Sequence, residues 1–259
     1  MKNRTNWFNI LVAETPETQI RFNRFLAKAG LGSRRVCDDL IQKGLVTVNG
    51  EIEKNPAVRI EPGKDIVLFQ GKQISLEVHH HYYLLNKPAQ VITTTSDPYG
   101  RATIIDLVPS QDRIYPVGRL DYDTTGVILL TNDGDLAYSL THPKFQIPKT
   151  YSVRVLGKVS QADLERIPLG INIEAKTPAV AEILEYNYLD RFTDIKMVLR
   201  EGRKREIKRI FMALGHRVVK LHREKFAFLT IEGLAVGKYR ELSTDEIKKL
   251  KELADGYQG

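Results

Sequence analysis

A carboxylate in a loop punctuated by glycines is the feature of this sequence best suited to chemistry. Asp121 and Arg119 lie in the run Gly118-Arg-Leu-Asp-Tyr-Asp-Thr-Thr-Gly126, directly before the apolar stretch Val127–Leu130. A carboxylate at the mouth of a buried strand is partly desolvated and is held by rigid backbone. These conditions suit a nucleophile or an acid–base group. Asp121 is therefore the candidate catalytic residue.

Three other interpretations of this loop stay open on the residues alone. Asp121, Asp123 and Gly126 imitate the start of a calcium loop, but its twelfth position is Asn132 rather than Glu, and a strand follows instead of a helix. Paired carboxylates could cleave a glycoside, but nothing locates a second carboxylate across a cleft. Asp121 could also simply stabilise the loop by local hydrogen bonds.

A second candidate feature is a strongly basic segment near the C-terminal end. Residues 200–225 contain ten Lys or Arg and three Glu, so this segment carries the whole net charge of +7. Apolar residues recur through it at helical spacing, which predicts a helix with one packed face and one basic face. A basic stripe with few balancing acids favours an anionic partner over a merely solvated face. The apolar positions are Ile207, Ile210, Phe211 and Leu214.

Length and composition exclude several classes of protein. The 259 residues fit one large domain or two of moderate size, and 42% hydrophobic with 27% charged residues is typical of a globular chain rather than a disordered or fibrous one. No stretch approaches the roughly 18–20 apolar residues that span a bilayer. The single cysteine, Cys37, excludes an internal disulfide framework and a multi-cysteine zinc site. We expect a cytoplasmic protein without a membrane partner.

Residues 20–76 predict a small module of two helices and short strands. Phe22, Phe25, Leu26 and Ala29 have helical spacing, and Arg21, Arg24 and Lys28 lie on the other face. Ser33 is a candidate N-cap for a second helix, which directs Val36, Cys37, Leu40 and Ile41 inward. Asn49-Gly50 between two alternating runs predicts a hairpin. Further short strands are expected at residues 58–60 and 66–68.

Arg34 and Arg35 fall in the first turn of that second helix, where the helix dipole disfavours cations. Their position therefore needs another reason. Holding a phosphate at the start of the helix supplies one.

Residues 82–259 predict a second, larger α+β domain. Strands are expected at residues 82–85, 91–95 and 127–130, with a short helical segment at 103–108. Residues 1–19 show little periodicity and are expected to form an arm. The segment from Gln73 onward has little apolar character, and we place a linker at residues 77–81. The three consecutive histidines 79–81 point to opposite faces of an extended chain, which is poor geometry for a metal site.

The run Arg21–Arg35, followed by Leu40–Gly44 and the hairpin Val46–Gly50, resembles the S4-type RNA-binding domain. The resemblance covers about a fifth of the chain and follows the family's order of helix, loop, helix and hairpin. In that family the two helices bind structured RNA. The module also occurs in ribosomal proteins, in tyrosyl-tRNA synthetases and in small heat-shock RNA-binding proteins, so it indicates RNA without specifying a reaction.

The central motif Gly118–Gly126, followed by residues 129–137, is similar to that of the RsuA-type pseudouridine synthases of ribosomal RNA. Other blocks occur in the family's order, and the combined resemblance spans about residues 20–250. The family joins an S4-type domain to a catalytic domain with a mixed, largely antiparallel sheet. The further blocks are Asn86-Lys-Pro88, Gly100-Arg-Ala-Thr103, His142-Pro143, Lys149-Thr-Tyr151-Ser-Val153, residues 201–210 and Leu214-Gly-His216.

The resemblance implies that uridine in RNA becomes pseudouridine, with no cofactor and no metal. Asp121 is then the catalytic aspartate, and Lys208 matches the basic partner that keeps it ionised, where many relatives have arginine. Tyr151 matches the tyrosine that packs on the target base, and Arg119 matches a residue near the flipped nucleotide. Ile207 and Leu221 are expected to pack near the base or in the core. Whether Asp121 attacks the ribose, attacks the uracil or acts as a base stays open.

Two positions depart from the family pattern, namely Gln90, where glycine is common, and Glu206, where glutamine is frequent. Neither is expected to touch Asp121 or Tyr151. The remaining candidate RNA-binding residues are basic: Arg21, Arg24, Lys28, Arg34, Arg35, Lys87, Arg203, Arg205 and Arg209.

The expected partner is ribosomal RNA or a pre-ribosomal particle, with the large subunit favoured, and nothing requires more than a monomer. A non-catalytic RNA-binding assembly factor is the alternative. A tRNA synthetase with a similar appended module is disfavoured, because its nucleotide-binding motifs are missing.

Overall fold

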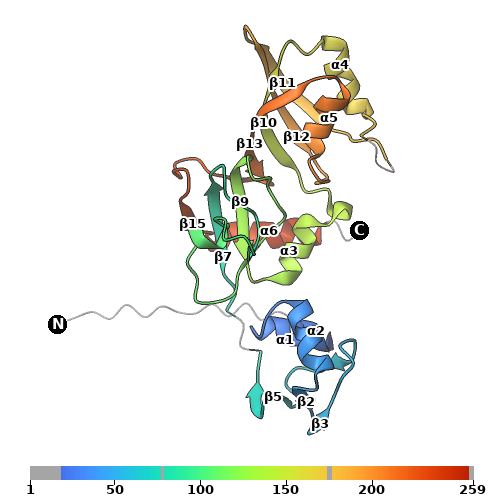
Figure 1. Cartoon of the computed structure of the whole chain (residues 1–259), viewed down its shortest axis with the longest axis vertical. Helices are drawn as coiled ribbons and strands as arrows, with labels where there is room; N and C mark the ends of the chain where they lie inside the picture. Colours follow the sequence, from blue (N-terminus) through green and yellow to red (C-terminus); the bar gives the residue numbers. More distant parts are fainter. Residues whose placement is uncertain (1–18, 77–78, 174–176, 257–259) are drawn as a thin grey trace, which may run out of the picture. The chain divides into compact units, whose positions relative to one another are not determined.

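The computed structural model describes residues 19–76, 79–173 and 177–256, and it divides the chain between His79 and His80 into two compact units (Figure 1). The predicted N-terminal arm lies outside the described residues except for Gln19, as does part of the predicted linker. No helix of the described residues has the length and apolar character to cross a membrane.

Unit 1 contains two helices and two small sheets. Helix α1 covers Phe22–Lys28 and α2 covers Arg34–Gln42. The strands β3 (Glu51–Ile52), β2 (Val46–Val48), β5 (Val67–Phe69) and β6 (Lys72–Ile74) form one antiparallel sheet in that order. The strands β1 (Ile20–Arg21) and β4 (Arg59–Ile60) pair separately. Strand β6 occupies the start of the segment that showed little apolar character.

The local signals in unit 1 operate as the sequence indicates, with one exception. The Ser33 hydroxyl accepts a hydrogen bond from the Val36 backbone at 3.2 Å and caps α2. Asn49 and Gly50 both have positive φ, as the tight turn between β2 and β3 requires. Cys37 and Ile41 are buried, whereas Val36, predicted to face inward, is 46% exposed. Val36 lies in the first turn of α2, and its side chain occupies the space that a Cβ at Gly32 would need.

Unit 2 is built on a nine-stranded sheet. The main order is β11 (Glu182–Tyr188), β12 (Phe192–Leu199), β10 (Lys149–Leu156), β13 (Arg217–Phe226), β9 (Thr125–Thr131), β7 (Tyr82–Lys87) and β15 (Tyr239–Glu241). Strand β14 (Leu229–Thr230) pairs with β13, and β8 (Tyr115–Pro116) pairs with β9. All these pairs are antiparallel except β9 with β13. The predicted mixed, largely antiparallel α+β architecture is confirmed.

The helices of unit 2 cover both faces of this sheet. They are α3 (Gly134–Thr141), α4 (Gln161–Arg166), α5 (Glu206–Ala213) and α6 (Thr244–Asp255), with 3-10 turns η1 (Ile105–Leu107), η2 (Pro143–Phe145) and η3 (Ile167–Leu169). Figure 1 shows α3 and α6 beside β7 and β9, and α4 and α5 beside β10 to β12.

Side chains of β9 alternate between two hydrophobic cores. Ile128 and Leu130 join the core that contains α5, whereas Val127 and Leu129 join the core that contains α3 and α6. Successive side chains of a strand point to opposite faces, so an uninterrupted apolar run indicates a strand buried on both sides. Strand β9 is therefore held rigidly at its start, where it follows the Asp121 loop.

The strand expected at residues 91–95 does not form. Only Ile92 makes a bridge there, to Thr103, and the neighbouring residues bend. Buried Thr93 directs its hydroxyl to the carbonyl oxygen of Leu120 at 2.7 Å, so this segment supports the Asp121 loop instead of extending a sheet.

Candidate active site

The structure gathers the candidate catalytic side chains around a cavity of about 350 Å³, within the range of small-ligand sites. Six parts of unit 2 line it: the loop that contains Asp121, the end of α3 at Thr141, the start of β10, the end of β12 at Leu199, the segment from Glu201 to Ile207 that leads into α5, and β13. These parts lie up to about a hundred residues apart in the sequence, and the sheet brings their side chains together.

Asp121 lies at the edge of this cavity beside a lysine. Lys208 Nζ is 3.4 Å from Asp121 Oδ2 and 2.5 Å from Asp123 Oδ1. The Asp121 side chain is 31% exposed and that of Asp123 is 68% exposed. Burial raises the pKa of Asp123, but the hydrogen bond and charge of Lys208 outweigh this effect, so its pKa lies below the ordinary value. One ammonium group therefore pairs with two carboxylates.

Lys87 supports the backbone of the Asp121 loop from the protein interior and does not lie on an RNA-binding surface. Its side chain is fully buried, and Nζ donates to the carbonyl oxygens of Pro88, Asp121 and Thr124 at 3.0, 3.2 and 2.9 Å. Burial lowers the pKa of Lys87 to about 8, while Asp123 and Asp121 act in the opposite direction. The prediction that Lys87 contacts RNA is wrong, because the strand expected to end at Leu85 continues to Lys87 and carries it into the interior.

Tyr151 lines the cavity from β10 and is only 9% exposed. Ile207 and Leu221 are also buried there, within the same core. The expectation that these two apolar side chains pack near the site is confirmed. A flat ring and two aliphatic side chains thus form apolar walls beside the Asp121 carboxylate.

The basic candidates of unit 2 differ in whether their side chains are exposed or are bound within the protein. Arg119 and Arg205 are exposed at the cavity. Arg203 is bound within the protein: its guanidinium contacts Glu201 at 2.7 Å and the carbonyl oxygen of Thr177 at 2.6 Å. Arg209 donates to the carbonyl oxygen of Ile173. Arg203 therefore holds the segment before α5 to Thr177, and Arg209 holds α5 itself to Ile173.

In unit 1, Arg21, Arg34 and Arg35 are exposed, and Arg24 and Lys28 are half-buried. Arg21 belongs to β1 immediately before α1 rather than to the helix itself. The start of α2 thus presents two exposed guanidinium groups beside the Ser33 cap.

Three buried ionisable residues at the cavity, namely Lys149, Glu206 and Arg223, were not among the sequence candidates. Lys149 Nζ donates to the carbonyl oxygen of Ile147 at 2.8 Å, and burial together with the charge of Arg223 lowers the pKa of Lys149 to about 8. Burial raises the pKa of Glu206. For Lys149 the sequence did contain a signal. It lies two positions before Tyr151 on the same strand, and residues two apart on a strand point to the same face.

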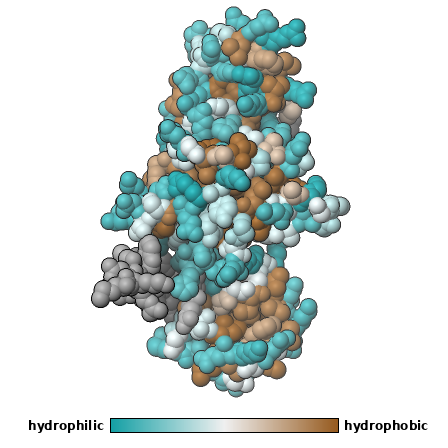
Figure 2. Space-filling view, turned by 90° about the vertical axis from the view of Figure 1, so that its left-hand side faces the viewer, coloured by the Kyte–Doolittle hydropathy of each residue, from teal (hydrophilic) through white to brown (hydrophobic). Residues whose placement is uncertain are grey.

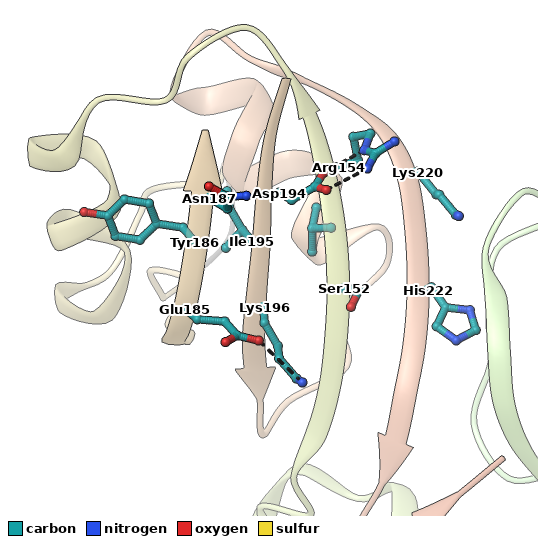
Figure 3. A pocket seen from close by; sticks show the side chains of 11 residues that line it. Ser152, Arg154, Glu185, Tyr186, Asn187, Asp194, Ile195, Lys196, Lys220 and His222 are labelled. Atoms are coloured by element: carbon teal, nitrogen blue, oxygen red, sulfur yellow. Dashed lines mark hydrogen bonds and ion pairs between the residues drawn. The ribbon is translucent and has the colours of Figure 1, made fainter. Parts of the chain in front are cut away.

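A second hollow, of about 460 Å³, lies over β10, β11, β12 and β13 (Figure 3). Four of its charged side chains pair with one another: Arg154 with Asp194 at 2.6 Å, and Lys196 with Glu185 at 3.6 Å. Ser152 and Arg154 alternate with Tyr151 and Val153 along β10, so they lie on the sheet face opposite the first cavity. This face has the paired charges of a solvated surface.

The histidine segment does not gather metal ligands. His81 Nε2 contacts Asp112 Oδ2 at 2.7 Å, and its ring stacks on Tyr83. Across the three described ranges, no group of three or more His, Cys, Asp or Glu side chains is arranged to hold a metal ion.

The model of the RNA pseudouridylate synthase family matches residues 81–213, and that of the S4 domain matches residues 20–66. The first match covers the Asp121 loop, β10 and α5. This chain belongs to the RNA pseudouridine synthase family. As a member, it is an isomerase that converts uridine in RNA to pseudouridine and carries an N-terminal S4 domain.

Relatives of this synthase match nearly their full lengths. The chain is 42% identical to ribosomal large subunit pseudouridine synthase B of Bacillus subtilis, over 91% of this chain and 97% of the relative. It is 32% identical to ribosomal small subunit pseudouridine synthase A of Escherichia coli, over 88% and 98%. A crystal structure of a pseudouridylate synthase has a TM-score of 0.64 at 32% identity, over 89% and 99%.

Proposed function

We propose that this synthase isomerises uridine in ribosomal RNA, with Asp121 as the catalytic aspartate. The observation that carries the proposal is the contact of Asp121 with Lys208 at the mouth of a cavity walled by Tyr151. The 42% identity to a large-subunit enzyme, against 32% to a small-subunit enzyme, supports large-subunit RNA as the substrate. Asp121, Lys208 and Tyr151 meet within one chain, so the proposed site needs no residue from a second copy.

In the reaction, the bond from N1 of uracil to C1′ of ribose breaks, and a bond from C5 to C1′ replaces it. Asp121 must be ionised to act as nucleophile or base. The Lys208 ammonium group favours that charge by attraction across 3.4 Å. Because Lys87 and Thr93 fix the backbone of the loop, the carboxylate is held in place before substrate enters.

Tyr151 is assigned to hold the target base through its ring face while the base detaches and turns. The base must first leave its RNA helix, at a cost of a few kcal/mol. Arg119, exposed beside Asp121, is assigned to fill the space that the base vacates or to hold its phosphate.

Contacts to the RNA backbone supply the free energy for this extrusion. The exposed guanidinium groups of Arg34, Arg35 and Arg205 are assigned to phosphate contacts. Such contacts release counterions from RNA, so binding should weaken as salt concentration rises.

Tritium release from transcripts labelled at C5 of uridine tests the substrate assignment. Loss of the C5 proton accompanies formation of the new bond, so each turnover releases one label. We expect release from unmodified 23S transcripts and little from 16S transcripts. Release from 16S alone would transfer the assignment to the small subunit. Release from neither would contradict free ribosomal RNA as the substrate and favour an assembly particle or a tRNA.

A further inference from the structure

Arg223 lies beside Tyr151 on the floor of the catalytic cavity. The two are cross-strand partners in the antiparallel pair of β10 and β13, so their side chains share one face of the sheet. Arg223 is only 2% exposed, and it lines the same cavity as Asp121 and Leu221. A buried guanidinium group therefore lies within the site that receives the base.

The hydrogen-bonding capacity of this guanidinium group is incompletely used. Nε donates to the carbonyl oxygen of Val127 at 2.7 Å, whereas Nη2 is buried without an acceptor among the described residues. The guanidinium carbon lies 5.1 Å from the ring centre of Phe226, which is a weaker contact. A buried charged donor without an acceptor destabilises the empty protein. A ligand that supplies the acceptor recovers this energy on binding.

The surroundings of Arg223 make the cavity floor electropositive. Lys149 is the second buried basic group there, and the charge of Arg223 contributes to lowering its pKa. Glu206 is the buried carboxylate of the cavity, but its oxygens contact Arg203, at 2.9 Å for the backbone nitrogen and 3.7 Å for Nε. The floor is therefore suited to a substrate group that becomes negatively charged.

We propose that Arg223 binds the uracil of the target nucleotide and stabilises the negative charge that this base acquires during the reaction, an inference that rests on the proposed function. When the bond from N1 to C1′ breaks, its electron pair remains on uracil, whose carbonyl oxygens share the charge. When the carboxylate instead adds to C6, the resulting enolate places the charge on O4. In both cases a donor fixed beside Tyr151 stabilises the charged base more than the neutral one.

The later step returns these electrons. The pair on the base forms the new bond from C5 to C1′, and any bond that Asp121 has formed to C6 or to C1′ breaks and releases the carboxylate. C5 then loses its proton to a base, N1 takes up a proton, and neutral pseudouridine results. Arg223 stays protonated throughout, since it acts by hydrogen bonding and charge rather than by proton transfer.

Arg223→Gln tests the proposal, because glutamine keeps a donor for the Val127 carbonyl but removes the charge. We expect kcat to fall about 100- to 1000-fold, as for removal of one fixed donor from a developing anion, with KM changed less than about threefold. Arg223→Lys restores the charge, so its kcat should be about tenfold higher than that of Arg223→Gln. Arg154→Gln is the matched control, because Arg154 lies on the opposite sheet face and pairs with Asp194. It should retain the wild-type kcat.

The nature of the leaving base separates an electrostatic role from a structural one. Fluorine at C5 withdraws electrons and makes uracil a better leaving group, so Arg223→Gln should lose about tenfold less rate on 5-fluorouridine transcripts than on uridine transcripts. Since fluorine cannot leave C5 as a proton, both reactions are followed by the disappearance of the starting nucleoside in nuclease digests. If Arg223→Gln does not fold, Arg223→Lys carries the same comparison.

An unchanged kcat in a folded Arg223→Gln variant overturns the proposal, as does an equal loss on both bases, which would assign Arg223 to packing alone. Wild-type enzyme that converts neither base overturns the proposed function and this inference with it. Wild-type activity with a fully active Arg223→Gln variant overturns this inference alone.

Discussion

Lys208 serves two carboxylates, and this sharing sets the charge of the site. Its Nζ is 2.5 Å from Asp123 and 3.4 Å from Asp121. Asp123 is largely exposed, so its attraction to Lys208 is screened by water more than that of a shielded pair. The Asp121 carboxylate is better shielded, so water screens its attraction to Lys208 less.

Removal of this cation should impair turnover more than removal of the second carboxylate. We expect Lys208→Met to lower kcat about 100-fold, because two adjacent carboxylates then lack their counterion. Asp123→Asn leaves Lys208 free to approach Asp121 and should change kcat less than about threefold. Steady-state kinetics on the preferred transcript measures both. A larger loss in Asp123→Asn than in Lys208→Met would contradict the assignment of roles.

Lys87 should make stability depend on alkaline pH. Its pKa is about 8 in the folded protein and 10.5 in the unfolded chain, so between these values the unfolded chain binds more protons. Stability therefore rises with pH in this window, by up to about 2 kcal/mol between about pH 7.5 and about pH 9.5. Lys87→Met lacks this gain and leaves three carbonyl oxygens without their donor, so it should be less stable at every pH.

Urea unfolding of both proteins at the two pH values measures this effect. The difference in free energy of unfolding between wild type and Lys87→Met should widen as pH rises. A difference that stays constant or narrows would show that Lys87 is not held below its ordinary pKa.

Single residues also show what could be inferred before the structure. Asp121 was a candidate from its loop alone, but Tyr151 and Lys208 were found only through resemblance to a family, because no local pattern reveals that residues 87 positions apart meet. Lys87 was misassigned, since a lysine at a strand end is usually exposed, and the extension of β7 by two residues decides its burial. Arg223 was hidden among ten basic residues whose common interpretation was an outer surface.

The element on which the site depends most is the parallel contact of β9 with β13. Gly126 pairs with Arg223, and a Cβ at Gly126 would overlap the backbone of Arg223, where no side-chain movement could relieve it. Gly126 also has φ of +111°, a conformation that residues with side chains rarely adopt. This glycine joins the Asp121 loop to the strand that carries Arg223 and Leu221.

We therefore expect Gly126→Ala to lower the free energy of unfolding by about 3 kcal/mol or more, since strain and backbone overlap act together. Gly202→Ala is the control, because a Cβ there meets nothing within 4 Å and its φ is ordinary. Its stability should remain within about 0.5 kcal/mol of wild type. Thermal unfolding of both variants measures these stabilities. Equal stabilities of Gly126→Ala and Gly202→Ala would show that β9 and β13 can separate without cost.

Elements with strong local signals were predictable, and those decided by long-range pairing were not. The capped helix α2, the Asn49-Gly50 hairpin and the buried run of β9 follow from propensity and alternation. The run Val91–Thr95 has the residue types of a strand but lacks a continuous neighbour, so its backbone turns to support Leu120. The parallel pairing within an otherwise antiparallel sheet has no local signal.

At the scale of the whole molecule, an RNA-binding unit and a catalytic unit each have their own hydrophobic core. Figure 2 shows hydrophobic residues reaching the surface among hydrophilic ones on the face in view. The functions of the two units should therefore separate: losses in unit 1 affect RNA affinity, and losses in unit 2 affect turnover.

Salt dependence of RNA binding tests this separation. Joint substitution of Arg34 and Arg35 by Ala should reduce the slope of log K against log salt by about 1–2, with kcat at saturating RNA unchanged within about threefold. Joint substitution of Lys64 and Lys72, exposed in the strand half of unit 1, removes the same charge and should leave the slope nearly unchanged. Equal slopes for the two pairs would contradict a phosphate contact at the start of α2.

The catalytic role of Asp121 is the central claim, and a single-turnover reaction with Asp121→Asn tests it most directly. Wild type, Asp121→Asn and the control Asp112→Asn, which alters an exposed carboxylate paired with His81, are mixed in excess with the preferred labelled transcript. We predict no tritium release by Asp121→Asn, with RNA affinity within about threefold of wild type, and full release by Asp112→Asn. Release by Asp121→Asn at a rate near that of wild type would contradict the account.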